Sequence, residues 1–221
     1  MASYFNYFPT TFYTSGANNA TALDIVTNIT SRFGFEQSLK ENSAAFYPYL
    51  VKDDETPETI AYKMYGNAER HWIVLMFNDI VDPQYDWPLG YDNLIQYIDK
   101  KYQGAEYANN ATTGAGLTWA QNVNNVQAYY KIITRTPKIL TGENKTITEK
   151  IQVTANTYAN VSVTTTDYTL QNGTKITESI TKERVTYYDY EVQLNEDKRK
   201  INLLKSEFVP AVFKEFKQVI A

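Results

Sequence analysis

The sequence contains no cysteine and only one histidine in 221 residues. Without cysteine the chain can form no disulfide, no thiolate zinc site and no cysteine nucleophile. The single histidine, His71, has no serine nucleophile motif near it, and one imidazole cannot supply the usual zinc ligand sets. We therefore interpret His71 as a packing residue. The lack of cysteine also fits folding in a reducing cytosol.

Several other signals are missing. No apolar run approaches the roughly 18 residues of a membrane span. Residues 1–13 lack the basic start and long apolar middle of a secretory signal. The net charge is −4, and 21 Lys and Arg are scattered among 25 Asp and Glu, whereas phosphate binding needs clustered basic residues. No glycine-rich phosphate loop is present. We therefore expect no membrane, no nucleic acid and no cofactor.

The acidic residues form no recognisable catalytic or metal-binding pattern. Asp53, Asp54 and Glu55 precede a predicted helix, where carboxylates complement the helix dipole. Paired catalytic carboxylates would need one raised pKa in an apolar pocket, and three acids in a turn are expected to be solvated. The spacing of Asp79 and Asp82 matches no EF-hand loop. The sequence therefore predicts neither an enzyme nor a metal site.

Aromatic residues are abundant, with 19 Tyr, 10 Phe and 3 Trp. Tyrosine is favoured in β-sheets, and aromatic residues are also enriched where proteins bury surface against partners. Both interpretations remain open from composition alone. The candidate partner-binding residues lie near the two ends of the chain: Tyr4, Phe5, Tyr7, Phe8, Phe12, Tyr13, Phe213 and Phe216.

In the first half of the chain, residues 1–45 are predicted to form an extended arm followed by a helix that Gly34 ends. The helix is indicated by apolar and threonine side chains at helical spacing: Leu23, Val26, Thr30 and Phe33. A short strand is expected over Phe46–Lys52. Thr56-Pro57 then begins a helix that ends at Gly66, and Asn67 caps a second, buried helix. A further helix is predicted over Tyr91–Tyr102.

In the second half, residues 103–125 are rich in Ala, Asn, Thr and Gly and are predicted to be a linker or mobile loop. Residues 126–205 have β character. Asn172-Gly173 is a two-residue hairpin signal, and alternation continues from Tyr188 to Leu194. The segment Lys198–Leu204 could be strand or helix, and we expect a strand. Residues 206–221 form an amphipathic helix capped by Ser206, whose apolar stripe packs on the chain's own sheet or docks on another subunit.

The segment 46–102 resembles a LysM domain. The similarity lies in Tyr49-Leu50-Val51, in the turn and first helix up to Met64-Tyr65-Gly66-Asn67, and in the second helix followed by Asn78-Asp79. The resemblance implies a βααβ fold, two helices carried on two antiparallel strands, that binds N-acetylglucosamine polymers. Its core positions are Ile60, Met64, Tyr65, Trp72, Leu75 and Met76. The acids that replace the usual glycine of the turn, and a closing strand reduced to Trp87-Pro88-Leu89, argue against glycan binding.

A narrower resemblance covers roughly half of the chain. Tyr65-Gly66-Asn67, His71–Asp79 and Asp82–Trp87 are similar to the LysM-like baseplate wedge protein 53 family of T-even-type contractile-tailed bacteriophages. The aromatic opening Tyr4–Pro9 and the ending Asn195–Ile201 are also similar to that family. Residues 103–186 match nothing recognised and are expected to be an inserted β region. The predicted class is therefore α+β, a LysM-like βααβ module with flanking helices, inserted antiparallel strands and a C-terminal amphipathic helix.

The resemblance implies a structural subunit of the tail baseplate, present in the virion and assembled in the host cytoplasm. It would join neighbouring wedges into a six-fold ring around the hub, in contact with other wedge proteins and with the baseplate protein that initiates the sheath. Two other hypotheses follow from the LysM similarity. One is a peptidoglycan-binding module that attaches to the cell wall. The other is a LysM-targeted hydrolase, but the β-rich region shows no histidine-based or paired-acid site.

Overall fold

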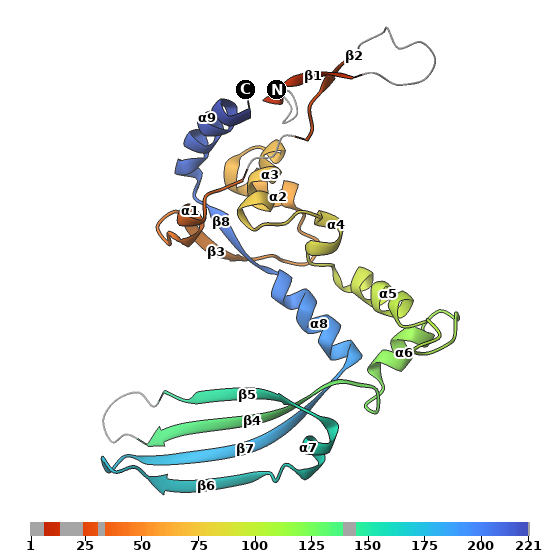
Figure 1. The fold of residues 1–221 in the computed structure, drawn as a ribbon, viewed down its shortest axis with the longest axis vertical. Coiled ribbons are helices and arrows are strands. Elements are labelled where there is room, and N and C mark those ends of the chain that lie inside the picture. Colours follow the sequence, from red (N-terminus) through yellow and green to blue (C-terminus); the bar gives the residue numbers. More distant parts are fainter. Residues whose placement is uncertain (1–6, 14–23, 31–33, 139–144, 221) are drawn as a thin grey trace. The chain divides into compact units, whose positions relative to one another are not determined.

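The computed structural model describes residues 7–13, 24–30, 34–138 and 145–220 (Figure 1). The chain divides into two compact units, Met1–Gly90 with Glu196–Ala221, and Tyr91–Asn195. Helices and strands occur in both, so the predicted α+β class is confirmed. The second unit is thus inserted into the first, a division that differs from the five consecutive segments predicted from the sequence.

The first unit is built on a pair of antiparallel strands with helices between them in the sequence. Strand β3 pairs with β8 from Phe46↔Leu204 to Leu50↔Lys200. Between β3 and the second unit the chain forms two main helices and a 3-10 turn, giving the order β-α-α-β. The elements are β1 (Thr10–Tyr13), β2 (Asp24–Thr27), α1 (Gln37–Glu41), β3 (Phe46–Leu50), α2 (Pro57–Tyr65), η2 (Ala68–Arg70), α3 (His71–Phe77), α4 (Pro83–Asp86), β8 (Lys200–Leu204), η3 (Ser206–Phe208) and α9 (Val209–Ile220).

The closing strand predicted at Trp87-Pro88-Leu89 is wrong. The partner of β3 is β8, which lies beyond the inserted unit and was correctly predicted as a strand. The indole N–H of Trp87 donates to the carbonyl of Glu55 at 2.8 Å, so this ring is buried against the turn after β3. The next residue, Pro88, has no N–H to donate to a sheet.

The ends of α2 follow the predicted capping residues. The hydroxyl of Thr56 accepts from the N–H of Thr59, and Pro57 takes the first helical position, where no N–H is needed. Gly66 closes the helix at φ 70°, a left-handed conformation that side chains disfavour. Asn67 then caps η2 by accepting from the N–H of Glu69, and η2 leads directly into α3.

The core of the first unit lies among α2, α3, β8 and α9. The rings of Trp72 and Phe216 are 4.8 Å apart between centroids. Val209, Val212 and Phe216 of α9 are buried, so most of its apolar stripe packs on the chain's own unit. Ser206 begins the 3-10 turn η3, and the α-helix itself starts at Val209.

The helix predicted from Leu23 to Phe33 is wrong within the described residues. Asp24–Thr27 is strand β2, paired with β1 from Thr10↔Thr27 to Tyr13↔Asp24. Three of its four residues, Ile25, Val26 and Thr27, are β-branched, which favours a strand over a helix. Leu23 and Phe33 lie outside the described residues.

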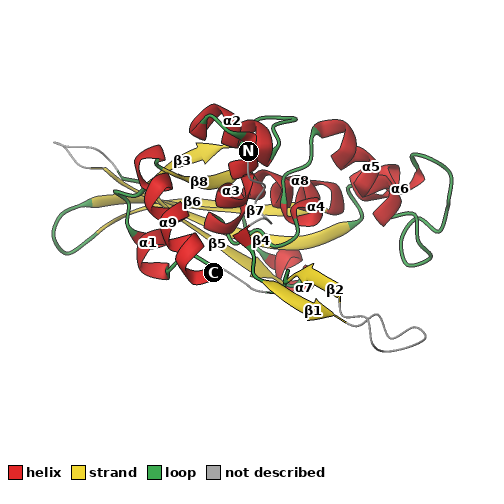
Figure 2. Ribbon diagram, turned by 90° about the horizontal axis from the view of Figure 1, so that it is seen from above, coloured by secondary structure: helices red, strands yellow, loops and turns green. Residues whose placement is uncertain are grey.

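The second unit combines helices with a four-stranded antiparallel sheet in the order β5-β4-β7-β6 (Figure 1). Figure 2 colours the helices red and the strands yellow. The predicted β region contains these four strands, but Ala155–Asn160 and Tyr188–Leu194 within it belong to helices. Thr186 and Asp189 form a reciprocal capping box at the start of the second of these helices, which outweighs the alternating pattern. The elements are α5 (Tyr91–Lys101), α6 (Ala115–Gln121), β4 (Val126–Lys138), β5 (Ile147–Val153), α7 (Ala155–Asn160), β6 (Thr164–Thr169), β7 (Lys175–Thr186) and α8 (Tyr187–Lys198).

Two local predictions in this unit need correction. The segment predicted as a linker contains α6, whose first turn is held by Asp99; the carboxylate of Asp99 accepts from the N–H groups of Gly114 and Leu117. The Asn172-Gly173 hairpin exists, but its loop has three residues. Leu170 and Thr174 close it, and only Gly173 has a positive φ, 84°, whereas a two-residue type I′ turn would require one at Asn172 as well.

Candidate interaction surfaces

The aromatic residues of the two chain ends meet inside the first unit. The ring of Phe216 lies 6.0 Å from that of Tyr7 and 6.1 Å from that of Phe8, and Tyr7 also contacts Phe213. Phe8 and Phe216 are buried. These rings therefore hold the start of the chain onto α9, with Tyr7 and Phe213 half-buried. The candidate residues Tyr4 and Phe5 lie outside the described residues.

The remaining candidate aromatic residues lie on the β1–β2 ribbon. Phe12 is 70% exposed, Tyr13 59% and Ile25, which pairs with Phe12, 68%. All eight residues of the two strands are exposed. A two-stranded ribbon without further packing is marginally stable in water. This apolar ribbon is a candidate surface for a protein partner.

The six predicted core positions of the βααβ module lie on α2 and α3. Ile60, Tyr65 and Trp72 are buried, and the other three are half-buried against the same cluster: Met64, Leu75 and Met76. The hydroxyl of Tyr65 donates to the carbonyl of Leu204 at 3.0 Å and thereby ties α2 to β8. Burial raises the pKa of this hydroxyl. The six residues form a structural core and present no reactive group.

The acidic turn after β3 is occupied by contacts within the first unit. Glu55 is buried, and its carboxylate accepts from Lys63 at 2.6 Å, from the N–H of Lys52 and from the hydroxyl of Tyr49. Burial raises the pKa of Glu55, but the three hydrogen bonds outweigh it and lower the pKa below its usual value. Burial and the same hydrogen bond raise the pKa of Tyr49 to about 12. A carboxylate that stays ionised is unsuited to general-acid chemistry.

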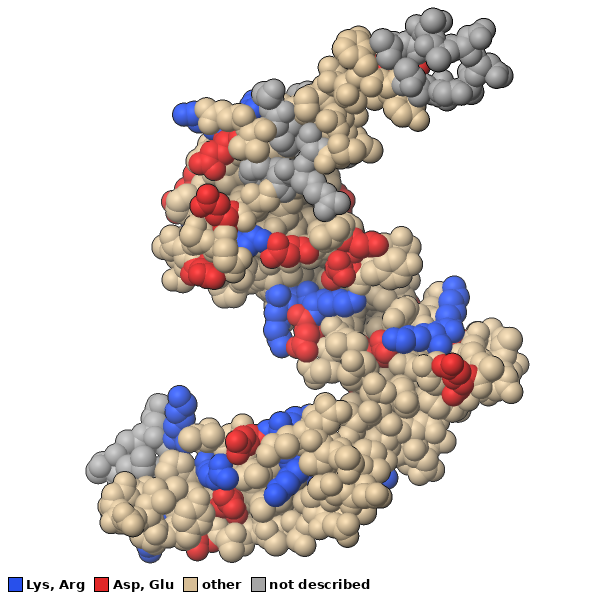
Figure 3. Space-filling model, in the orientation of Figure 1, with Lys and Arg blue, Asp and Glu red and all other residues tan. Residues whose placement is uncertain are grey.

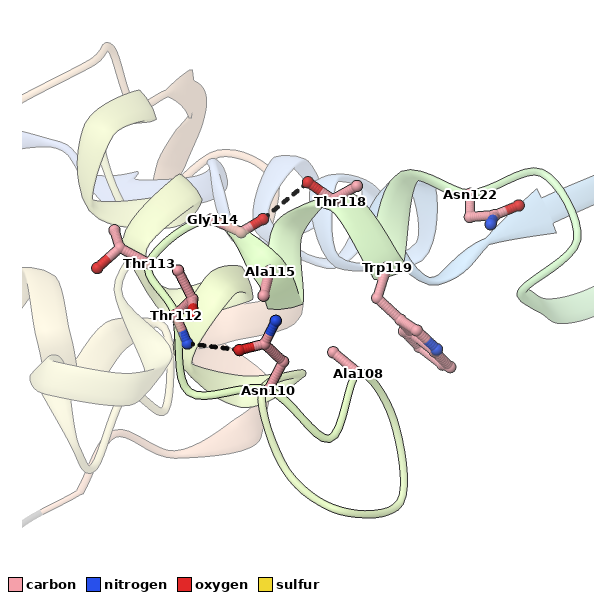
Figure 4. A pocket seen from close by; sticks show the side chains of 9 residues that line it. All are labelled: Ala108, Asn110, Thr112, Thr113, Gly114, Ala115, Thr118, Trp119 and Asn122. Carbon is pink, nitrogen blue, oxygen red and sulfur yellow. Dashed lines mark hydrogen bonds between the residues drawn. The ribbon is translucent and has the colours of Figure 1, made fainter.

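Two open pockets have no catalytic constellation. One, of about 720 Å³, lies between the start of α1 and the end of α9. The other, of about 570 Å³, lies beside α6 (Figure 4). Some of its polar groups form hydrogen bonds with one another. The hydroxyl of Thr118 donates to the carbonyl of Gly114, and the N–H of Thr112 donates to the side-chain oxygen of Asn110. Its lining has no charged side chain: Ala108, Asn110, Thr112, Thr113, Gly114, Ala115, Thr118, Trp119 and Asn122.

Metal and membrane signals are also lacking in the described part of the chain. None of its His, Asp and Glu residues form a group of three that could hold a metal ion. No helix there combines the length and apolar character that a membrane crossing requires. The imidazole of His71, half-buried at the start of α3, contacts the carbonyl of Ala68 at 3.1 Å. Acidic and basic side chains lie scattered among the other residues on the surface seen in Figure 3.

A family model described as base plate wedge protein 53 matches residues 3–219, a span that includes both compact units. The chain belongs to the base plate wedge protein 53 family. The chain is also similar to baseplate wedge protein gp53 of Enterobacteria phage T4, with 36% identity over 55 residues. That similarity covers 25% of this chain and 28% of the relative, less than a third of either.

Membership of the wedge protein 53 family confirms the family identified from the sequence and makes the chain a structural protein of a phage tail baseplate. It also changes the view of residues 103–186, which matched nothing recognised. The family match runs from residue 3 to residue 219 and therefore spans them.

The structural roles of two residues of this wedge family member were not predicted from the sequence. The amide of Asn78 donates to the carbonyl of Asn202 at 2.9 Å and accepts from its N–H at 2.7 Å, which fastens β8 to the end of α3. Arg199 donates to the carbonyls of Val51 and Leu89 and forms ion pairs with Asp53 and Glu196. Asn78 and Arg199 both fall in segments that carry the family resemblance, but sequence spacing gives no sign of these contacts.

Proposed function

We propose that the chain is a structural subunit of the baseplate wedge that joins neighbouring wedges into the six-fold ring around the hub through protein–protein contacts. The observation that carries the proposal is the family match over residues 3–219. Its partners would be other wedge proteins, the neighbouring wedge and the baseplate protein that initiates the sheath. It would assemble in the host cytoplasm and remain in the tail of the virion.

The exposed β1–β2 ribbon supports a joining role. Phe12, Tyr13 and Ile25 expose large apolar side chains on a ribbon in which no strand residue is buried. A partner that covers them would stabilise the ribbon and bury apolar surface at the same time. We therefore assign partner binding to the ribbon and to the preceding aromatic residues, Tyr4 and Phe5.

We further propose that the β3-α2-α3-β8 arrangement is a LysM-like scaffold used as a building block. Its order, two helices between two antiparallel strands, matches the fold that the LysM resemblance implies, with β8 as the closing strand. The turn that corresponds to a sugar-holding loop packs on the chain itself, where Asp53 pairs with Arg199 and the Glu55 carbonyl accepts from Trp87. Such packing favours a structural use over glycan binding.

The test is to disrupt the gene for this chain in its phage and to separate the tail precursors by sedimentation. We expect single wedges to accumulate and rings to be absent, with normal rings restored by the gene supplied in trans. Complete rings formed without the chain, or virions that carry the chain outside the tail, would overturn the proposal. Saturable sedimentation of the purified chain with cell wall would favour the alternative, a peptidoglycan-binding LysM module.

A further inference from the structure

The four-stranded sheet of the second unit has two unlike faces. The register pairs Tyr130 with Gln152 and Glu183, and the face that contains them carries mainly hydroxyl and charged side chains. The opposite face is here called the isoleucine face. Its residues are Tyr129, Lys131, Ile133, Arg135 and Pro137 of β4, Ile147, Glu149, Ile151 and Val153 of β5, Thr164, Thr166 and Tyr168 of β6, and Ile176, Glu178, Ile180, Lys182 and Arg184 of β7.

The isoleucine face is largely uncovered. Helix α7 covers one end, where the ring of Tyr158 lies 4.9 Å from that of Tyr129. Beyond that end none of the five isoleucines is buried; Ile147 is 60% and Ile151 43% exposed, although a two-layered sheet would bury such positions. Ile133 and Ile180 lie directly opposite each other, and the other three isoleucines lie on the same face of β5 and β7. Exposed apolar side chains gathered on one face mark interaction sites.

Charged side chains form ion pairs on both faces of the sheet. On the hydroxyl-rich face Lys150 forms an ion pair with Glu183 at 2.9 Å and lies over the ring of Tyr130. On the isoleucine face Arg135 bridges Glu149 and Glu178, which satisfies both carboxylates.

Three cations of the isoleucine face have no acidic partner among the described residues. Lys131, Lys182 and Arg184 lie on adjacent strands, Lys131 directly opposite Lys182. No carboxylate of the described residues lies within ion-pair distance of any of them. The Lys182 ammonium lies 4.9 Å from the centroid of the Tyr158 ring and donates to the Tyr158 carbonyl at 3.4 Å. Like charges placed opposite each other on a sheet are unfavourable unless an anion lies nearby.

We propose that the isoleucine face is a docking surface for an acidic segment of another baseplate polypeptide, with apolar side chains on the isoleucines and carboxylates at Lys131, Lys182 and Arg184. The inference rests on the proposed function, which supplies other baseplate polypeptides as neighbours. Charge complementarity selects the partner, because covering these cations with a neutral surface would bury unpaired charge.

A nucleic acid fits this face less well than an acidic protein segment. Phosphates need cations spaced along a strand, whereas here the three unpaired cations lie together toward one end of the face. Glu149 and Glu178 lie on the same face and would repel a phosphate backbone. A second copy of this chain remains an outcome that the test distinguishes.

The test uses purified virions and a zero-length carbodiimide, which joins a lysine amine to a carboxylate in direct contact. We expect mass spectrometry to find Lys131 or Lys182 joined to an Asp or Glu of a different baseplate polypeptide in virions, and not in the isolated chain. Crosslinks only to a second copy of this chain would overturn the assignment. Equal acylation of both lysines in virions and in the isolated chain would also overturn it, since an uncovered face stays reactive.

A variant pair tests the surface independently. Lys131→Glu should lower ring assembly roughly tenfold or more, because it places like charges together in the contact. Its matched control is Lys175→Glu on the hydroxyl-rich face, which should assemble normally, and both purified chains should melt as the unaltered chain does. Normal assembly of Lys131→Glu would overturn the inference while leaving the proposed function intact. If the chain is absent from the tail altogether, both the inference and the proposed function fail.

Discussion

Three carboxylates are buried in the described residues and each is held by donors that come from elsewhere in its own unit. Glu55 is bound by Lys63 and Tyr49, Asp99 by the backbone of the α6 turn, and Glu191 by Lys101 and Tyr102 at 2.7 Å each. A buried charge is tolerated only when it is paired and hydrogen-bonded. These acids therefore lock elements together, and the lowered pKa values of Glu55 and Asp99 fit that role.

Glu55→Gln should destabilise the first unit by about 1–3 kcal/mol, because an amide N–H₂ would face groups that are themselves donors. The pKa of Glu55 is lowered by folding, so its contribution is complete above the unfolded-chain pKa of about 4.3 and is lost as the pH falls through the lower folded-state value. Denaturant unfolding at neutral pH and in this acidic window measures the difference. Glu58→Gln, exposed in the first turn of the helix α2 that follows, is the control and should change little.

Trp72→Ala should cost about 3–5 kcal/mol, since it removes a buried indole that packs on Phe213 and Phe216. Thermal unfolding followed by circular dichroism measures the loss. Tyr62→Ala, on the exposed side of α2, is the matched control and should melt within a few degrees of the parent chain. A Trp72 variant as stable as this control would mean that α9 does not pack on α3.

At the scale of elements, the helices with strong end signals were predictable, as were the short strands β3 and β8, whereas strand β2 was not. The α2 helix carries Thr56-Pro57 at one end and Gly66 at the other, and these residues fix its boundaries locally. Strand β2 has no such end signal. It forms by pairing with β1, which lies in an earlier segment of the sequence. Helix α8 shows the reverse case, in which an alternating pattern was overridden by the Thr186–Asp189 cap.

The candidate surfaces were only partly predictable from the sequence. Aromatic content pointed to the chain ends, but composition could not separate Phe12, which is exposed, from Phe8, which is buried against Phe216. That difference depends on contacts between the two ends of the sequence. The isoleucine face likewise depends on the register of four strands, which no local pattern specifies.

The close contact between α5 and α6 can be tested by a substitution that adds a single methyl group. A Cβ at Gly116 would overlap the carbonyl oxygen of Asp99 and lie 2.9 Å from the backbone nitrogen of Gln103. Because backbone must move to relieve this, we expect Gly116→Ala to destabilise the second unit by about 1–3 kcal/mol or more. Gly104→Ala, where nothing lies within 4 Å, is the control. Hydrogen exchange of the α6 amides measures the effect, and equal protection in both variants would contradict the close packing.

At the scale of the whole molecule, the first unit is discontinuous in sequence but closed in space. The chain leaves it near Leu89 and returns near Arg199, and the guanidinium of Arg199 donates to the Leu89 carbonyl at 3.3 Å. Every strand pair and ring contact of its core lies within the unit. We therefore expect the first unit to fold when a short Gly-Ser linker replaces residues 91–195.

The shortened chain should unfold cooperatively, and amide exchange should show protection at β3 and β8. Asn78→Ala in the same shortened chain is a useful companion, because it removes both hydrogen bonds to Asn202 and should weaken protection of β8. A shortened chain without protected β3 and β8 amides would show that the inserted unit is required for folding of the first.

The β1–β2 ribbon separates folding from assembly. Phe12→Ser with Ile25→Ser removes its two largest paired apolar side chains, both more than two-thirds exposed, so the melting temperature should stay unchanged. If a partner covers the ribbon, the same change removes apolar burial at that contact and should reduce the yield of rings in complemented phage. Val123→Ser, also exposed but in a turn of the second unit, should assemble normally. Deleting residues 1–13 would be a poorer test, because it also removes Phe8 from the core. Full assembly by the ribbon variant would assign the joining contact to another surface.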